Sequence, residues 1–118
     1  MTGRASRSKG HRGELQVAHL IRDLTGWDVR RRVRQHDGDS DLEGVPGWAV
    51  EVKNCAAPTL GDIDRWTVQA KAQAKESQRW VLFYKRQPGQ WRAVFCLADV
   101  EVETSVQDWC QCAREALA

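Results

Sequence analysis

The chain has 118 residues, the size of one small domain with a single hydrophobic core. Its apolar fraction of 42% and charged fraction of 29% are typical of a globular protein, and no apolar stretch is long enough to span a membrane. Because the N-terminus also lacks the apolar core of a signal peptide, we expect a cytoplasmic protein with no membrane partner.

The net charge of +2 is unevenly distributed along the chain. Residues 1–36 contain nine Lys or Arg and three Asp or Glu, whereas residues 37–118 contain nine Lys or Arg and thirteen Asp or Glu. This asymmetry indicates an anionic partner at the N-terminal third, and nucleic acid is the commonest such partner. The alternative is a solvated basic tail.

The four cysteines lack the spacing of a zinc site, since Cys110 and Cys112 are separated by a single residue and no C-x-x-C occurs. The pattern favours free or buried thiols, and it assigns no role to Cys110 or Cys112.

In chain order, residues 1–10 have no hydrophobic period and predict a flexible basic arm, followed by a single domain over residues 11–118. Residues 11–25 predict a helix, because Leu15, Val17, Ala18, Ile21 and Leu24 repeat at helical spacing. Glu14 borders this stripe, either as a charge favoured by the helix dipole or as a site residue.

Residues 27–33 predict a strand that carries most of the densest basic run, Arg30, Arg31, Arg32 and Arg34. Guanidinium groups suit phosphates, but the same charges also protect an edge strand from aggregation. Residues 35–47 predict a polar loop with turn pairs at residues 37–38 and 46–47.

Residues 48–54 predict a strand on which Glu51 and Lys53 share one face. The turn before it can bring Asp41 back beside Glu51. Two carboxylates would then form an oxygen-rich site for Mg²⁺, and Lys53 could orient a water or stabilise developing charge. Such a set suits phosphodiester hydrolysis. The alternative is a structural ion pair of Glu51 with Lys53 or Arg31.

The remaining elements are a helix over residues 60–77, a strand over 79–85, a turn, a strand over 91–97 and a last helix over 105–117. Thr59 or Asp62 caps the first of these helices. The two strands predict an antiparallel hairpin, and the acidic residues 99–104 predict a segment that faces away from an anionic partner. The order α-β-β-α-β-β with a C-terminal helix predicts an α/β fold with a mixed sheet flanked by helices.

Asp41, nine further residues and then Glu51-Val52-Lys53 resemble the motif of the PD-(D/E)XK nuclease superfamily. Over about residues 8 to 98, the chain is similar to the small Holliday junction resolvases of archaea and phages, whose first helix carries a Glu, here Glu14. Ser40 stands where the motif has Pro, and Asp37 or Asp39 could take the place of Asp41.

The resemblance implies a restriction-endonuclease-like fold and a Mg²⁺-dependent, structure-selective endonuclease, with Mn²⁺ as a substitute. The implied substrate is branched DNA, such as the four-way junctions of DNA recombination and repair, in the host cytoplasm if the protein is phage-encoded. Two symmetric nicks imply a homodimer, whose interface we expect on strand 79–85 or on the last helix.

Residue by residue, the resemblance implies that Asp41 and Glu51 hold the metal with support from Glu14, and that Lys53 acts on the attacking water. Gln69, rather than Lys71, would join the site from the following helix. The phosphate contacts we expect are Lys9, Arg12, Arg30, Arg31, Arg32 and Arg34. The alternatives are a general nicking or repair nuclease of the same fold, a DNA-binding module without chemistry, or a purely structural domain.

Overall fold

The computed structural model describes residues 3–33 and 39–117. The elements are α1 (Gly3–Thr25), β1 (Arg30–Arg31), β2 (Leu42–Glu43), β3 (Trp48–Lys53), α2 (Leu60–Gln73), β4 (Arg79–Gln87), β5 (Gln90–Leu97), β6 (Val100–Ser105) and α3 (Val106–Glu115). The strands form one six-stranded sheet in sequence order. Only β3 and β4 pair in parallel, so the fold is α/β with a mixed sheet, as predicted.

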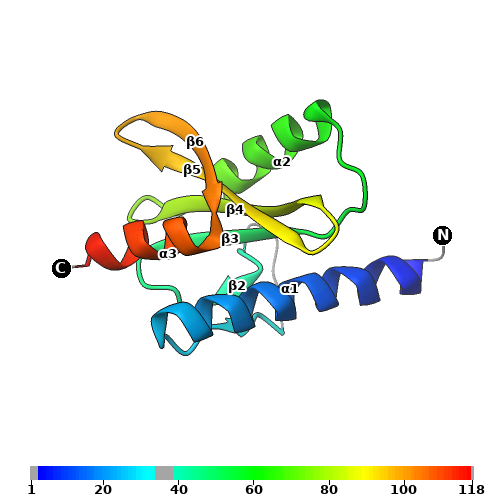
Figure 1. Ribbon diagram of the computed structural model, residues 1–118, viewed down its shortest axis with the longest axis horizontal. Coiled ribbons are helices and arrows are strands. Elements are labelled where there is room, and N and C mark those ends of the chain that lie inside the picture. Colours follow the sequence, from blue (N-terminus) through cyan, green and yellow to red (C-terminus); the bar gives the residue numbers. More distant parts are fainter. Residues whose placement is uncertain (1–2, 34–38, 118) are drawn as a thin grey trace.

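The sheet has helices on both faces, with α2 on one and α1 and α3 on the other (Figure 1). The main core lies on the side of α1 and α3, where Val50 of β3 packs in one cluster with Trp109 of α3. A smaller cluster around Leu82 and Tyr84 lies under α2. The predicted alternation of β3 is confirmed, because its apolar residues enter the main core and its Glu51 contacts α2.

Helix α2 connects the parallel strands β3 and β4. Thr59 and Asp62 form a reciprocal capping box, in which each side chain accepts a hydrogen bond from the backbone N–H of the other. The helix ends at Gln73, four residues earlier than predicted, because the chain must turn back to enter β4. A turn hydrogen bond from Gln78 N–H to the Lys75 carbonyl makes that reversal.

Helix α1 begins at Gly3, so the expectation that residues 3–10 form a flexible arm is wrong. Extending a helix from turns that are already packed costs little, even through Gly10, which is worse than Ala by about 1 kcal/mol. The buried side of α1 is formed by Val17, Ala18 and Ile21. Leu15, predicted to join them, is 46% exposed.

Three parts of the sheet differ from the sequence prediction. The strand expected over residues 27–33 is only two residues long, because its partner β2 is equally short and ladder hydrogen bonds exist only between paired strands. Strand β2 itself lies inside the expected polar loop, and β6 occupies the expected acidic segment. Strand β4, proposed as a dimer interface, lies between β3 and β5 and its central residues are fully buried.

Candidate active site

Glu51 lies at the middle of the sheet, on a strand that is paired on both sides. Strand β3 pairs with β2 and β4, and Glu51 is aligned with Leu82 of β4. Only 3% of Glu51 is exposed. A carboxyl in such a place has lost most of its hydration, which is costly for its ionised form. Its neighbours therefore decide which protonation state it takes.

Asp41 is held in place by three hydrogen bonds, two of which join it to the same strand. Its backbone N–H donates to the carbonyl of Val50 at 2.9 Å, and its carbonyl accepts from Arg32 at 2.9 Å. Its side-chain Oδ2 accepts from the N–H of Val52 at 2.8 Å. These contacts place the Asp41 carboxyl next to that of Glu51, as predicted. Of the three aspartates left open by the sequence, Asp41 hydrogen-bonds to β3, and Asp37 lies outside the described residues.

A glycine makes this return of the chain possible. Gly44 has a φ of +93°, and a Cβ at this position would lie 2.2 Å from the carbonyl oxygen of Asp28. Only Gly fits both the backbone conformation and the space. The turn from β2 into β3, and with it the placement of Asp41 beside Glu51, depends on this residue.

Glu14 reaches the same place from α1. Gly13 packs so closely on Asn54, at the end of β3, that an added Cβ would lie 2.7 Å from the Asn54 Cβ. Glu14 follows directly, is 9% exposed, and has its Oε2 3.9 Å from Nε of Arg31. The structure thus brings Glu14 near Asp41 and Lys53, and the predicted position of Glu14 beside the buried stripe is confirmed.

The electrostatic balance of the three carboxyls is unfavourable for full ionisation. Burial raises the pKa of Glu51 to about 8, and the charge of Asp41 adds to this rise while Lys53 opposes it. Burial also raises the pKa of Glu14 to about 7, again with a contribution from the charge of Asp41. Arg31 and Lys53 oppose the second shift. A bound cation would relieve this repulsion.

Two buried carboxylate oxygens that lack a hydrogen-bond donor also fit a cation. Oε2 of Glu14 and Oε2 of Glu51 are buried and accept no hydrogen bond. Within residues 3–33 and 39–117, no group of three or more acidic, His or Cys side chains is arranged to hold a metal ion. The adjacent carboxyls of Asp41 and Glu51 offer two oxygen ligands, which suits Mg²⁺ because this ion usually keeps several of its waters.

Lys53 and Gln69 both contact Glu51. Nζ of Lys53 is 3.5 Å from Oε1 of Glu51, and Nε2 of Gln69 donates to the same oxygen at 3.3 Å. Lys53 is partly exposed, since 27% of its side chain is accessible, so its ammonium group can also reach a ligand from solvent. The structure brings together five predicted site residues, Glu14, Asp41, Glu51, Lys53 and Gln69.

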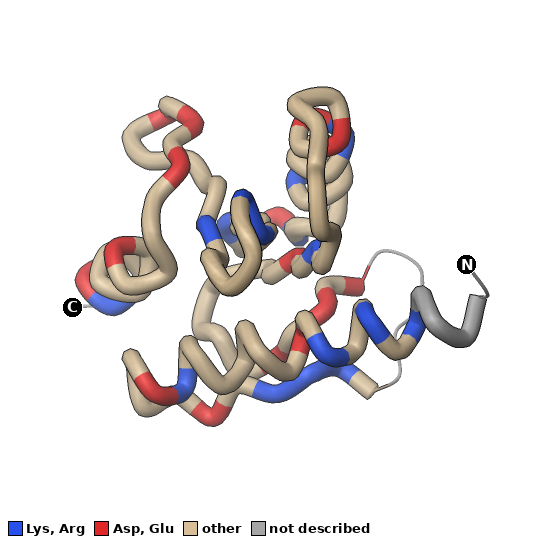
Figure 2. Tube along the Cα trace, turned by 45° about the vertical axis from the view of Figure 1, so that its right-hand side comes forward, with Lys and Arg blue, Asp and Glu red and all other residues tan. Residues whose placement is uncertain are grey.

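The basic residues predicted to contact phosphates do not converge on one place as the five site residues do. Those that the structure describes lie on the N-terminal half of α1 and on or directly after the neighbouring β1 (Figure 2). Several are already paired: Arg30 with Asp28 at 3.0 Å, Arg31 with Glu14, and Arg32 with Glu43 at 3.5 Å. Arg34 lies outside the described residues, and Lys9 and Arg12 lie on α1.

Sequence reasoning missed a polar cluster on the same face of the sheet as Glu51 and Lys53. Tyr84, which is aligned with Lys53, donates a hydrogen bond to Glu103. Arg86 and Arg92 also bind Glu103. These four residues lie on three separate strands, so no local sequence pattern marks the cluster.

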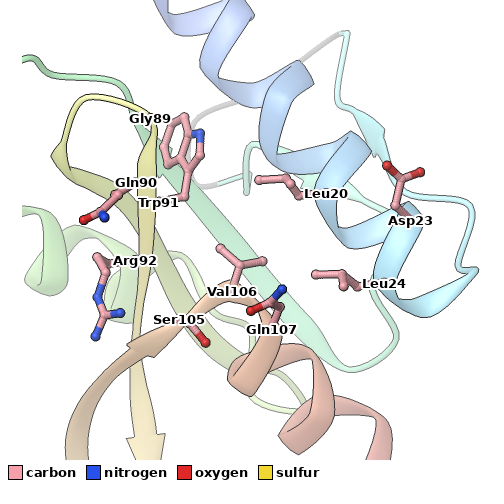
Figure 3. A pocket seen from close by; sticks show the side chains of 10 residues that line it. All are labelled: Leu20, Asp23, Leu24, Gly89, Gln90, Trp91, Arg92, Ser105, Val106 and Gln107. Atoms are coloured by element: carbon pink, nitrogen blue, oxygen red, sulfur yellow. The ribbon is translucent and has the colours of Figure 1, made fainter.

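A surface cavity of about 420 Å³ lies elsewhere, between α1, the β4–β5 turn and the start of α3 (Figure 3). The side chains of Leu20, Leu24, Trp91 and Val106 line it. None of the residues around this cavity is a predicted site residue, so the carboxylates and the cavity are separate features.

Comparison of the chain with protein-family models, with curated proteins and with solved structures gives no match. Among the helices of the described residues, none combines the length and the apolar character needed to cross a lipid bilayer.

Proposed function

We propose that the protein is a Mg²⁺-dependent endonuclease of the PD-(D/E)XK type, with the restriction-endonuclease-like fold of that superfamily. The observation that carries this proposal is the convergence of Asp41, Glu51 and Lys53 from two segments onto one buried place beside β3. A protein keeps two carboxyls in contact in a low-dielectric setting at a cost in stability. A metal-dependent reaction is a function that needs such an arrangement.

Each residue has a chemical task in this proposal. Asp41 and Glu51 would hold the metal, with Glu14 as a further carboxylate on the same side, and Gln69 fixes the orientation of the Glu51 carboxyl. Bound Mg²⁺ would supply Lewis-acid stabilisation of a phosphoryl oxygen. Lys53 would orient the attacking water and stabilise negative charge that develops on the phosphate.

The substrate class follows from charge and from the resemblance. Arg31 of β1 lies beside Glu14, and further basic positions on the N-terminal half of α1 add positive charge that favours a polyanion (Figure 2). The similarity to small Holliday junction resolvases specifies DNA four-way junctions, which these enzymes cut in recombination and repair. Two symmetric nicks need two sites, so the proposal includes a homodimer.

A DNA-binding module without chemistry is the second candidate. The absence of a three-ligand metal group among the described residues favours it. In that case, the carboxyls near Lys53 and Arg31 would serve only as ion pairs. The two candidates differ in what they require of Glu51: hydrolysis needs its carboxylate, whereas binding does not.

A cleavage assay separates the candidates. A labelled synthetic four-way junction and a linear duplex of the same sequence are incubated with the protein in Mg²⁺ and in EDTA. We expect paired nicks in the junction only, and their loss in EDTA, in Lys53→Ala and in Glu51→Gln. Lys75→Ala is the matched control, because Lys75 is exposed and lies two residues beyond the last residue of α2.

Other results would change the proposal in stated ways. Metal-dependent cleavage of both DNAs would replace the resolvase by a general nicking or repair nuclease. Tight, salt-sensitive binding by both wild type and Glu51→Gln, with no product in any metal, would favour the binding module. If neither DNA is bound or cut, the nucleic-acid proposal is wrong.

A further inference from the structure

A basic pocket lies on the other side of the Gly13–Asn54 contact from Glu14. It has a volume of about 290 Å³ and is bounded by α1, the segment after β3 and the β4–β5 hairpin. Three cations and two amides face it, and its lining contains no carboxylate. We call it the Lys85 pocket, and its polar lining residues are Lys9, Arg12, Gln16, Asn54 and Lys85.

Within the part of the chain that the structure describes, none of the three cations of this pocket forms a salt bridge. The salt bridges formed by the described residues engage other lysines and arginines, including Arg31 and Lys53. Two positive charges from α1 and one from β4 repel one another in this hollow. An anion bound between them would remove this repulsion, whereas a cation or an apolar ligand would not.

The pocket is also held in place by neighbouring side chains. Nζ of Lys85 lies 5.1 Å from the ring centroid of Trp91, whose Nε1 donates a hydrogen bond to Gln16 at 3.2 Å. On the other side, Nδ2 of Asn54 donates to the backbone carbonyl of Lys9 at 2.9 Å. These contacts join α1, β3 and β4 around the hollow, so its charges are positioned by the fold.

The position of the pocket relates it to the carboxylates. Asn54 follows Lys53 directly, and successive residues of an extended chain lie only about 3.3 Å apart along it. Lys53 belongs to the candidate active site, and Asn54, the next residue, lines the Lys85 pocket. Because successive side chains of an extended chain point to opposite sides, a polyanion would pass around the end of β3 to contact both Lys53 and the pocket.

We propose that the Lys85 pocket binds a second phosphate group of the nucleic-acid backbone, separate from the phosphate at Glu51 and Lys53. This inference rests on the proposed function, because it assumes a nucleic-acid ligand. A phosphate has several acceptor oxygens and suits the guanidinium fork of Arg12, the ammonium groups of Lys9 and Lys85, and the Asn54 amide. Binding of this phosphate would hold the nucleic-acid strand on both sides of the end of β3.

The test measures binding without cleavage. A fluorescently labelled four-way junction is titrated in EDTA at several salt concentrations with wild type, Lys85→Gln, Lys85→Arg and the control Lys75→Gln. A lost phosphate contact lowers the slope of log affinity against log salt by about 0.9, which corresponds to about eightfold weaker binding at about 0.1 M salt. We expect this loss in Lys85→Gln alone, with Lys85→Arg close to wild type.

A second measurement identifies the ligand at the pocket. The side-chain N–H signals of Asn54 and Arg12 are followed by NMR during titration with inorganic phosphate and with the junction. Shifts of both signals by the junction, weakened in Lys85→Gln, support the proposal. Shifts by inorganic phosphate without any shift by the junction would assign the pocket to free phosphate and overturn it.

The proposal and the proposed function can fail separately. A protein that cleaves the junction in Mg²⁺ but whose salt slope is the same in Lys85→Gln and wild type refutes the pocket alone. A protein whose binding depends on Lys85 but which never cleaves refutes the nuclease and supports the pocket.

Discussion

The raised pKa of Glu51 makes a prediction about stability in the absence of metal. Its pKa is about 8 in the folded chain and near 4.5 in the unfolded chain. Between these values the folded state binds more protons than the unfolded state, so the free energy of unfolding falls as pH rises. The stabilisation that comes from protonated Glu51 is complete below a pH of about 4.5, the pKa of Glu51 in the unfolded chain. It is lost as the pH rises through about 8, the pKa in the folded chain.

The size of this effect follows from the width of that range. Each pH unit inside it changes the free energy of unfolding by about 1.4 kcal/mol. From about pH 5 to about pH 7, Glu51 alone should therefore cost the metal-free protein about 3 kcal/mol. A small domain has a total stability of about 5–15 kcal/mol, so the change is large. Gln has the same shape but does not titrate, and Glu51→Gln should remove the cost.

Urea unfolding in EDTA, followed by tryptophan fluorescence, measures the prediction. Wild type should lose stability steeply from about pH 5 to about pH 7. Glu51→Gln should lose about half as much, because Glu14, whose pKa is raised to about 7, still titrates in this range, and it should be the more stable protein at pH 7. Glu76→Gln is the matched control, because Glu76 is exposed and its removal should leave the wild-type slope intact. Equal pH slopes in wild type and Glu51→Gln would refute the reasoning.

Three further predictions follow from the same contacts. Mg²⁺ at about 100 times its Kd should stabilise wild type by about 2.7 kcal/mol at pH 8, and Glu51→Gln should abolish the shift in urea midpoint. Gly44→Ala should cost at least about 2 kcal/mol, because its Cβ would meet a backbone oxygen 2.2 Å away. Gly47→Ala, with a similar φ but open space, should cost about 1 kcal/mol, and equal losses would contradict the clash. Tyr84→Phe should cost about 1 kcal/mol in the same unfolding assay, because Glu103 loses one of its donors; no loss would mean that Arg86 and Arg92 satisfy it alone.

The parts of the fold that the sequence predicted are those with strong local signals. The alternation of β3, the capping box at Thr59 and the apolar run of β4 each specify their element within a few residues. The β4–β5 hairpin follows from the turn between two such runs, and the structure confirms it. These signals need no knowledge of what the element packs against.

The missed strands depended on partners far along the chain. Strand β2 has two residues and exists because its neighbours pair with it, so no window of sequence marks it. Strand β6 was different, since Val100 to Glu103 alternate strictly between apolar and acidic residues, a period that favours a strand. Its turn is formed by Ala98 and Asp99 with φ of 50° and 65°, in place of the usual Gly or Asn.

The candidate site was predicted in its members but not in its energetics. Spacing along β3 placed Glu51 and Lys53 on one face, and a turn allowed Asp41 to return, but only the folded chain brings in Glu14 from α1.

In most proteins the local propensities, the hydrophobic pattern and the charges all favour the observed fold. A buried cluster of carboxyls is an exception, because its charges disfavour the fold that contains it. Lys53 and Arg31 reduce the conflict without removing it, because the pKa values of Glu14 and Glu51 stay raised. A purely structural role for Glu51 would be served as well by Gln, without the repulsion from Asp41. The presence of this destabilising cluster of carboxyls at the centre of the sheet is therefore the physical reason to look for a cation and a reaction there.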